Sequence, residues 1–289
     1  MKSVQFDQKT FTAQEIDTFK PMMKIGLVAT VTPKGFPHIT MLSTLKASDE
    51  TTLTWGQFTE GMSFGYAREN PKVGWLIMTL DKDLWRGRGR FTHTEKHGKD
   101  FDWYNQVPMF RYNAYFGIHT VYYMDLIGHT GMHPLPMPAI ILSAVKTIIA
   151  KTFFWKKGTE VLNHWTKSLF NKLDNLKFLA YIDQEGFPAI IPVIQAQSAG
   201  SQHLIFSTGA FTSEIKAIPT GVPVACFGLS LDMTDVLTRG TYQGLRWIGP
   251  HRCGVLAVDW VYSPMPPVPQ QIYPPLPLEP VREFDTVTQ

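Results

Sequence analysis

Short apolar runs separated by turn residues are the dominant pattern along this chain. The first run, 25–32, is rich in β-branched residues and is followed by the turn Pro33-Lys34-Gly35, where glycine tolerates the backbone angles that a turn requires. Similar runs predict further strands over 38–44, 51–57, 73–80, 85–93 and 115–125. Positions with helical spacing predict helices over 12–22, 62–70 and 100–111. The pattern is that of a mainly β unit with small helices.

Local signals support two of these helices. Thr12 stands where the first helix begins and Glu15 follows three residues later, which is the spacing of a capping box. The helix over 62–70 stops at Pro71, which cannot donate a backbone hydrogen bond.

The same pattern occurs twice, at a constant offset of 151 residues. The aligned blocks are Gly35-Phe36-Pro37 with Gly186-Phe187-Pro188, Leu53 with Leu204, and Arg88-Gly89 with Arg239-Gly240. Because separated blocks keep one offset without gaps, we infer an internal duplication. Each copy is expected to form about six short antiparallel strands in a compact Greek-key barrel. The second copy lacks a counterpart of the helix over 100–111.

The duplication divides the chain into four predicted segments. They are a first barrel with its N-terminal helix (1–130), a helical linker (131–174), a second barrel (175–262) and a proline-rich strap (263–289). The linker contains the most apolar stretch, 139–150, which is too short to span a bilayer and is interrupted by Lys146. We expect a packed or partly exposed linker helix there, with a helix on a membrane surface as the alternative. At the C-terminus we expect an extended polyproline strap packed on the body.

Composition excludes several classes of protein. The 289 residues are 44% hydrophobic with a net charge of +3, which excludes a disordered chain. Two cysteines form one disulfide at most. Basic residues are scattered, and the run 86–90 lies within a strand pattern, so nucleic-acid binding is not expected. The first ten residues lack the apolar segment of a secretory signal, and we expect a cytoplasmic protein.

The order of elements in the first copy resembles the FMN-binding split barrel of the pyridoxamine 5'-phosphate oxidase-like superfamily. The shared features are a strand, the turn Gly35-Phe36-Pro37, a strand with polar positions, the strand 53–57, a short helix ending at Asn70-Pro71, and Arg88-Gly89-Arg90-Phe91. The resemblance covers 12–125 and, more loosely, 177–262. Family members pair two barrels as a homodimer with flavin between them. For this chain, the resemblance implies an α+β, mainly β fold. Two tandem six-stranded split barrels would form a pseudo-dimer within one chain. The charged fraction of 18%, below the usual ~25%, agrees with a barrel–barrel face buried inside the chain.

The resemblance also implies where FMN would bind. A flavin needs donors for its phosphate, apolar or aromatic walls for its ring and hydrogen bonds for its ring edges. The matching positions are His38, Thr40, Met41 and Ser43 on the second strand, Trp55, Gly56, Gln57, Phe58 and Thr59 around the end of the third strand, and Met62 and Ser63 at the start of the short helix.

The chain departs from the family pattern in its basic residues. The short helix has no Lys or Arg before Arg68, where many family members carry a basic run. The phosphate would rest on hydroxyls, backbone N–H groups and His38, or on an arginine from elsewhere, with Arg88 and Arg111 as candidates.

The two copies differ at these positions. Ala189, Ile191 and Ile194 stand in the second copy where His38, Thr40 and Ser43 stand in the first, and Glu214 replaces Ser63. A carboxylate repels a phosphate. We therefore expect at most one good site per chain, built by the first copy and walled by the second.

Other reactive side chains support weaker hypotheses. Histidines four apart occur at 93 and 97 and at 129 and 133, but their contexts do not match a metal motif, and no metal site is predicted. Haem is an alternative cofactor, with His119, His129 or His251 as the axial ligand. Cys253 stands beside His251 and Arg252, which could lower its pKa, but no third residue completes a nucleophilic triad.

The leading hypothesis is a tandem split-barrel flavoprotein. It would bind FMN in the crevice between the barrels and act as an oxidoreductase on a small organic substrate, and no catalytic acid or base can be named. Two alternatives stay open: a non-enzymatic flavin- or haem-binding protein, and a cofactor-free interaction module. We expect a small-molecule substrate, no nucleic-acid partner and no stable membrane insertion, and self-association into a homo-oligomer stays open.

Overall fold

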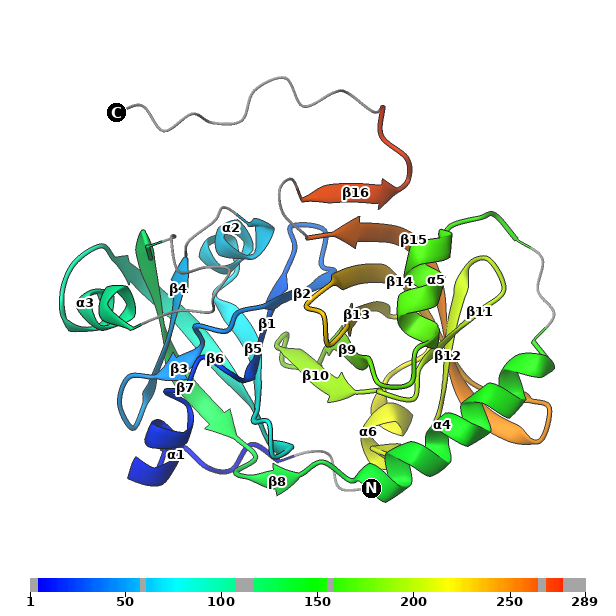
Figure 1. Cartoon of the computed structure of the whole chain (residues 1–289), viewed down its shortest axis with the longest axis horizontal. Coiled ribbons are helices and arrows are strands. Elements are labelled where there is room, and N and C mark those ends of the chain that lie inside the picture. The colour runs from blue at the N-terminus through cyan, green and yellow to red at the C-terminus, as the bar shows by residue number, and fades with distance from the viewer. Residues whose placement is uncertain (1–4, 58–60, 108–116, 155–157, 265–268, 278–289) are drawn as a thin grey trace.

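The computed structural model describes residues 5–57, 61–107, 117–154, 158–264 and 269–277. Figure 1 shows two β-sheet bodies side by side, the first copy in blue to green and the second in yellow-green to orange. The protein is mainly β, with six helices in the described part of the chain. Within each sheet, the neighbouring strands of the described residues pair antiparallel.

The first sheet has the strand order β2-β1-β5-β6-β7-β4-β3, with β8 paired to β6. Its strands are β1 (Ile25–Val31), β2 (Pro37–Met41), β3 (Lys46–Ala47), β4 (Thr52–Gln57), β5 (Lys72–Met78), β6 (Asp83–Glu95), β7 (Thr120–His129) and β8 (His133–Pro134).

The second sheet repeats this order as β10-β9-β13-β14-β15-β12-β11, with β16 paired to β15. Its strands are β9 (Leu176–Ile182), β10 (Pro188–Pro192), β11 (Gln197–Ala199), β12 (His203–Ser207), β13 (Pro223–Leu229), β14 (Asp235–Ile248), β15 (His251–Ser263) and β16 (Gln270–Tyr273). In each sheet six strands have five residues or more, which confirms the expected six-stranded unit.

The internal duplication is visible in the boundaries of the strands. β1 begins at Ile25 and β9 at Leu176, an offset of 151 residues, and β5 and β13 keep the same offset at both ends. The turns after β1 and β9 use Gly35 (φ 77°) and Gly186 (φ 81°), a backbone conformation that favours glycine. The two copies are therefore one fold built twice.

The helices are α1 (Ala13–Thr18), α2 (Met62–Glu69), α3 (Lys99–Gln106), α4 (Met137–Thr152), α5 (His164–Asn171) and α6 (Thr212–Ala217). The capping box is confirmed: the Glu15 N–H donates to the Thr12 hydroxyl, and the Glu15 carboxylate accepts from the Thr12 N–H. The prediction that this helix reaches residue 22 is wrong, because Pro21 disfavours helical geometry in the residue before it.

Two further predictions compare with the described elements. The second copy has no counterpart of α3, since β14 turns directly into β15 through Gly249. The predicted helix 100–111 is observed as far as Gln106, and 108–111 lies outside the described residues. The strap prediction needs a correction, because Gln270–Tyr273 forms β16 on β15. These four residues contain no proline, so their N–H groups are free to pair.

The two sheets pack face to face along a seam with approximate twofold symmetry. A buried cluster joins Leu27, Ile39 and Leu76 of the first copy to Phe178 and Phe227 of the second. The contact is close: a Cβ on Gly74 would lie 2.0 Å from the Pro188 carbonyl oxygen. This seam covers apolar surface inside the chain, as the low charge predicted.

The linker contributes α4 and α5, and α4 lies against β11, β12 and β15 of the second copy, as the green helix at the lower right of Figure 1 shows. No helix in the described residues is both long and apolar enough to cross a membrane.

Candidate functional site

Six side chains from four elements meet at one end of the seam, and we call them the Arg239 cluster. They are His38 of β2, Tyr66 of α2, Asp235 and Arg239 of β14, and Trp260 and Tyr262 of β15. Both copies contribute, so the cluster exists only because the two barrels pack together. Asp235 and Arg239 lie four positions apart on β14, and alternate residues of a strand share a face.

Arg239 is the centre of the cluster. Its Nη2 donates to Nδ1 of His38, and its guanidinium lies 4.1 Å from the centre of the Trp260 ring. Burial lowers its pKa, while a hydrogen bond with Tyr66 opposes that shift. Its Nε is buried and has no hydrogen-bond partner among the described residues. An arginine stays charged under these conditions, so the seam holds a buried cation with an unused donor.

His38 is held as a neutral imidazole. Burial lowers its pKa well below the usual range, and the adjacent Arg239 charge adds to the shift. Its ring lies edge-on to Tyr66, with 5.4 Å between centroids. Because a guanidinium only donates, Nδ1 accepts and Nε2 carries the proton. His38 therefore presents a donor and no charge to a ligand.

Two stacked aromatic rings wall the cluster on the second-copy side. Trp260 and Tyr262 lie 5.3 Å apart at an interplanar angle of 14°. Trp260 Nε1 donates to Gln271 of β16 at 2.8 Å, so the C-terminal tail holds this ring in place. A flat, fixed aromatic surface suits an aromatic ligand.

Asp235 is the titratable carboxyl of the cluster. Burial raises its pKa to about 7, and its charge helps to raise the pKa of Tyr262. Its Oδ1 is buried without a hydrogen-bond partner among the described residues. A carboxyl group whose pKa lies near neutrality can give or take a proton at working pH.

A pair of hydroxyls lies nearby on the first copy. The Thr40 and Ser63 side chains are hydrogen-bonded to each other, which joins β2 to the first turn of α2. Gly61 caps α2 without a side-chain hydrogen bond. The N-terminal N–H groups of a helix attract anions, and here no side-chain acceptor satisfies them at the cap.

The other predicted residues lie as follows. Trp55 is buried in the first barrel and stacks on Tyr122 at 5.5 Å, which makes it a core residue. The Gly56 N–H donates to the Thr44 hydroxyl at 3.1 Å, and Gln57 ends β4 half-buried. Met41 and Met62 pack against the buried cluster of the seam. The Ser43 carbonyl accepts a hydrogen bond from the Lys24 amine. Phe58, Thr59 and Arg111 lie outside the described residues.

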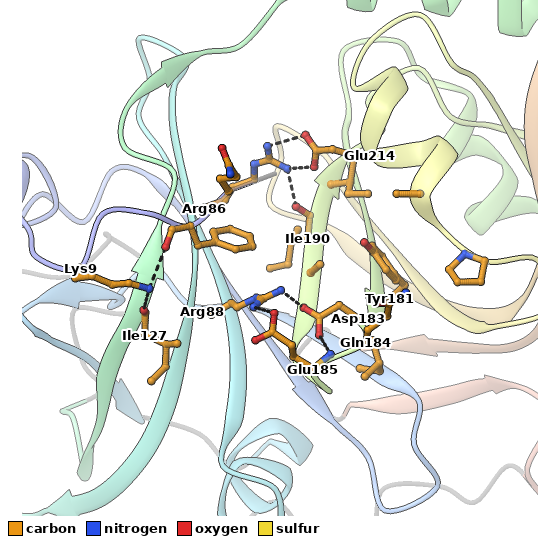
Figure 2. A pocket seen from close by; sticks show the side chains of 17 residues that line it. Lys9, Arg86, Arg88, Ile127, Tyr181, Asp183, Gln184, Glu185, Ile190 and Glu214 are labelled. Atoms are coloured by element: carbon orange, nitrogen blue, oxygen red, sulfur yellow. Dashed lines mark hydrogen bonds and ion pairs between the residues drawn. The ribbon is translucent and has the colours of Figure 1, made fainter. Parts of the chain in front are cut away.

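Arg88 does not join the Arg239 cluster. It occupies the equivalent position in the other half of the seam, where it borders a cavity of about 630 Å³. Its guanidinium is held by Asp183 at 2.6 Å and Glu185 at 2.8 Å, as Figure 2 shows. The sequence prediction that Arg88 serves a phosphate therefore conflicts with two carboxylates already bound to it.

The other charged side chains that line this cavity also balance one another. Arg86 forms two hydrogen bonds with the Glu214 carboxylate, at 2.6 and 2.9 Å (Figure 2). Among the lining residues of the cavity, three cations (Lys9, Arg86 and Arg88) are matched by three carboxylates (Asp183, Glu185 and Glu214). Such a lining offers no net charge to a phosphate.

The linker helix further alters the second copy. The Ala210 N–H donates to the Ser143 hydroxyl of α4 at 3.1 Å, and a Cβ on Gly209 would lie 2.2 Å from that hydroxyl oxygen. Gly209 and Ala210 align with Phe58 and Thr59 of the first copy. In the second copy, α4 therefore occupies the space beside the loop that follows β12.

Sequence reasoning missed five members of the cluster: Tyr66, Asp235, Arg239, Trp260 and Tyr262. It aligned Arg239 with Arg88 but named only Arg88 as a candidate, and Arg239 forms no ion pair among the described residues. The available signal was the difference between the copies, since Trp260 pairs with Arg239 where Gly128 pairs with Arg88.

The alternative sites of the sequence analysis lie elsewhere. His129 uses both ring nitrogens in hydrogen bonds with backbone groups, of Thr10 and Gly131, so iron ligation there would require one of them to break. No group of three or more His, Cys, Asp or Glu in the described residues could hold a metal ion. The idea that neighbours lower the pKa of Cys253 is wrong, because burial raises it to about 11.

Solved structures with a similar fold match one copy each. They include an FMN-binding protein from Syntrophomonas wolfei (13% identity, 40% of this chain and 81% of that chain, TM-score 0.34), a putative pyridoxamine 5'-phosphate oxidase from Lactobacillus delbrueckii (15%, 43% and 95%, 0.33) and HupZ from Group A Streptococcus (17%, 41% and 91%, 0.33). No protein-family model and no curated protein matches the chain. Each likeness is one of fold, and at these scores it identifies neither a ligand nor a reaction.

The strand order shared by the two sheets is a property of the chain itself. The chain carries that order twice at an offset of 151 residues, as the duplicated sequence predicts.

Proposed function

We propose that this chain binds one FMN per molecule at the Arg239 cluster and acts as a flavin-dependent oxidoreductase on a small organic substrate. The observation that carries the proposal is the different state of two equivalent arginines. Arg88 is bound by Asp183 and Glu185, whereas Arg239 faces a neutral imidazole and aromatic rings. Among the described residues, Arg239 in one half of the seam forms no ion pair, whereas Arg88 in the other half forms two.

The donor set around Arg239 fits a flavin. The Thr40 and Ser63 hydroxyls and the N-terminus of α2 suit the phosphate. The stacked rings of Trp260 and Tyr262 suit a flat ring system. The Nε of Arg239, like that of Arg88, is buried without a hydrogen-bond partner among the described residues, and such a donor costs about 1–3 kcal/mol until it finds an acceptor.

A bound flavin would supply the hydride or electron transfer, and the protein's residues would supply position and protons. Asp235, with a pKa of about 7, is the group best suited to hold a proton near the ring wall. His38 adds a neutral donor, and Arg239 adds positive charge that favours an anionic, reduced ligand.

The proposal is tested with a matched pair of variants, Arg239→Met and Arg88→Met. FMN binding is followed by flavin fluorescence quenching, and loading by thermal stabilisation. Loss of a charge-assisted hydrogen bond predicts about 10–100-fold weaker FMN binding for Arg239→Met. Arg88→Met is expected to lower thermal stability and leave FMN affinity within about threefold. Equal affinity for FMN in Arg239→Met and wild type would refute the site.

Activity is tested separately from binding. The loaded protein is first mixed with NADH or NADPH under anaerobic conditions, and bleaching of the flavin absorbance is recorded. Oxygen or a quinone is then added as the electron acceptor. Reduction of the bound flavin supports the oxidoreductase. Tight binding with no reduction by any donor would instead favour a non-enzymatic flavin-binding protein.

A further inference from the structure

The linker helix α4 buries a mixed face, formed by Ile140, Ser143, Thr147 and Ala150. Ser143 and Thr147 join this face to β12: the Ser207 N–H donates to Thr147 Oγ1 and the Ser207 hydroxyl donates to the Ser143 carbonyl, both at 2.9 Å. The opposite face carries a stripe of exposed large residues: Ile141, Leu142, Val145, Ile148, Ile149 and, at the C-cap, Phe153.

An ordinary surface helix turns its large apolar side chains toward the core, whereas α4 also carries large apolar side chains on its solvent side. Leaving isoleucine, leucine and phenylalanine side chains 39–59% exposed in one continuous stripe is unfavourable in water. A contiguous apolar patch of this kind marks an interaction surface. From Ile141 to Phe153 the stripe extends over about 18 Å at 1.5 Å per residue.

A second element extends the stripe at its C-terminal end. The β14–β15 turn contacts α4 there, since a Cβ on Gly249 would lie 2.5 Å from the Phe153 ring. Next to this turn, Trp247 is 73% exposed, and Arg246 and Arg252 are exposed on either side of it. Trp247 pairs with Arg252 across the hairpin.

The charges beside the stripe are all positive. Neither 137–154 nor 245–253 contains an Asp or Glu. Lys146 lies at the edge of the stripe, and Arg246 and Arg252 lie at its end. An apolar helix face bordered by cations and a tryptophan is the composition of a helix that lies in a membrane interface. A twofold contact through the middle of the stripe would instead bring two Lys146 side chains together.

We propose that α4 and the β14–β15 turn dock this protein reversibly on the surface of a bilayer that contains anionic lipids. The apolar stripe enters the headgroup region, Trp247 sits at the interface, and Arg246 and Arg252 meet the lipid phosphates. Each such cation is attracted to an anionic surface, and salt weakens that attraction. Docking on one face leaves the helix outside the hydrocarbon core, in keeping with its length. This inference does not rest on flavin binding.

The test is co-sedimentation of the full chain with vesicles. Vesicles of phosphatidylcholine alone are compared with vesicles containing phosphatidylserine, at low and high salt. We expect binding to the anionic vesicles that falls at least fivefold at high salt. Leu142→Ser with Ile149→Ser should abolish it, and Arg246→Glu with Arg252→Glu should weaken it about tenfold. Because all four side chains are solvent-facing, these variants should keep the wild-type circular dichroism.

The control is Met23→Ser, which removes an equally exposed apolar side chain beyond α1 in the first copy and should bind as wild type. Size-exclusion chromatography with light scattering is run on the same proteins. Failure of the wild type to bind anionic vesicles overturns the proposal. A wild-type dimer that the Leu142→Ser, Ile149→Ser pair converts to a monomer, without vesicle binding, assigns the stripe to a second copy instead.

Discussion

Both carboxylate oxygens of Glu214 accept hydrogen bonds from the Arg86 guanidinium, at 2.6 and 2.9 Å, across the seam between the two copies. Arg86 also donates to the Ile190 carbonyl at 3.1 Å. Glu214 aligns with Ser63 of the first copy, so a position that holds a hydroxyl in one copy holds the anchor of an ion pair in the other. The pair closes the second half of the seam to anions.

We predict that Glu214→Ser destabilises the protein and creates an anion site. Both side chains are largely buried, at 9% and 12% exposure, and removing one partner of such a pair typically costs about 3–5 kcal/mol. Urea unfolding measures the loss, and phosphate should raise the melting temperature of the variant more than that of the wild type. The double variant Arg86→Met, Glu214→Met is the control and should recover much of the stability. Unchanged stability in Glu214→Ser would show that the pair is not formed.

A second prediction concerns pH and Asp235. Its folded pKa of about 7 lies above the usual 3.8, so the folded state holds more protons between these values and stability falls as pH rises through them. Asp235→Asn removes this loss and should be more stable than wild type at pH 8 by up to about 4 kcal/mol. The difference should shrink toward zero near pH 4. Urea unfolding at several pH values checks this, and a pH-independent difference would contradict the buried carboxyl.

Lys24 gives the opposite slope. Its amine is buried and donates to the carbonyls of Pro21 and Ser43, at 2.7 and 2.9 Å, and burial lowers its pKa to about 7 from 10.5. The folded state therefore holds fewer protons between pH 7 and 10.5, and stability rises with pH in that window. Lys24→Met should flatten this rise, while the exposed Lys34→Met should keep it. Parallel pH profiles for wild type and Lys24→Met would contradict the assignment.

The seam itself is tested by two glycines. Gly74→Ala would place a Cβ 2.0 Å from the Pro188 carbonyl oxygen, and this backbone atom cannot swing away, so the copies must separate. We expect a loss of about 1–3 kcal/mol. Gly65→Ala in α2 meets nothing within 4 Å and should stabilise by about 0.5–1 kcal/mol. Thermal unfolding of both variants measures the pair, and equal melting temperatures would mean that the seam is looser than described.

Much of the fold could be predicted because its signals are local. The apolar runs, the Thr12 cap and the glycine turns at Gly35 and Gly186 depend on neighbouring residues, and the duplication doubled each signal. The absence of a helix between β14 and β15 followed from the missing segment in the second copy. Where prediction failed locally, as at the end of α1, one proline decided the outcome.

The site was less predictable because it depends on contacts between distant parts of the chain. His38 and Arg239 are 201 residues apart, and only the packing of the two sheets joins them. As an aromatic residue, Trp55 could form the wall of a ligand site, but its side chain faces the barrel core. The alternation of side chains along the strand places it there, and it stacks on Tyr122. For α4 the sequence left a packed, a partly exposed and a membrane-surface helix open, because the pattern alone does not show which side a β-sheet will cover.

The central claim is that the duplicated chain keeps one flavin site and has closed the other. The direct measurement is the number of FMN molecules bound per chain, from titration of the purified, flavin-stripped protein followed by fluorescence quenching and by release on denaturation. The account predicts one FMN per chain in the wild type and substantially weaker binding in Arg239→Met. Two equivalent FMN molecules per chain, or no binding at millimolar FMN, would contradict it.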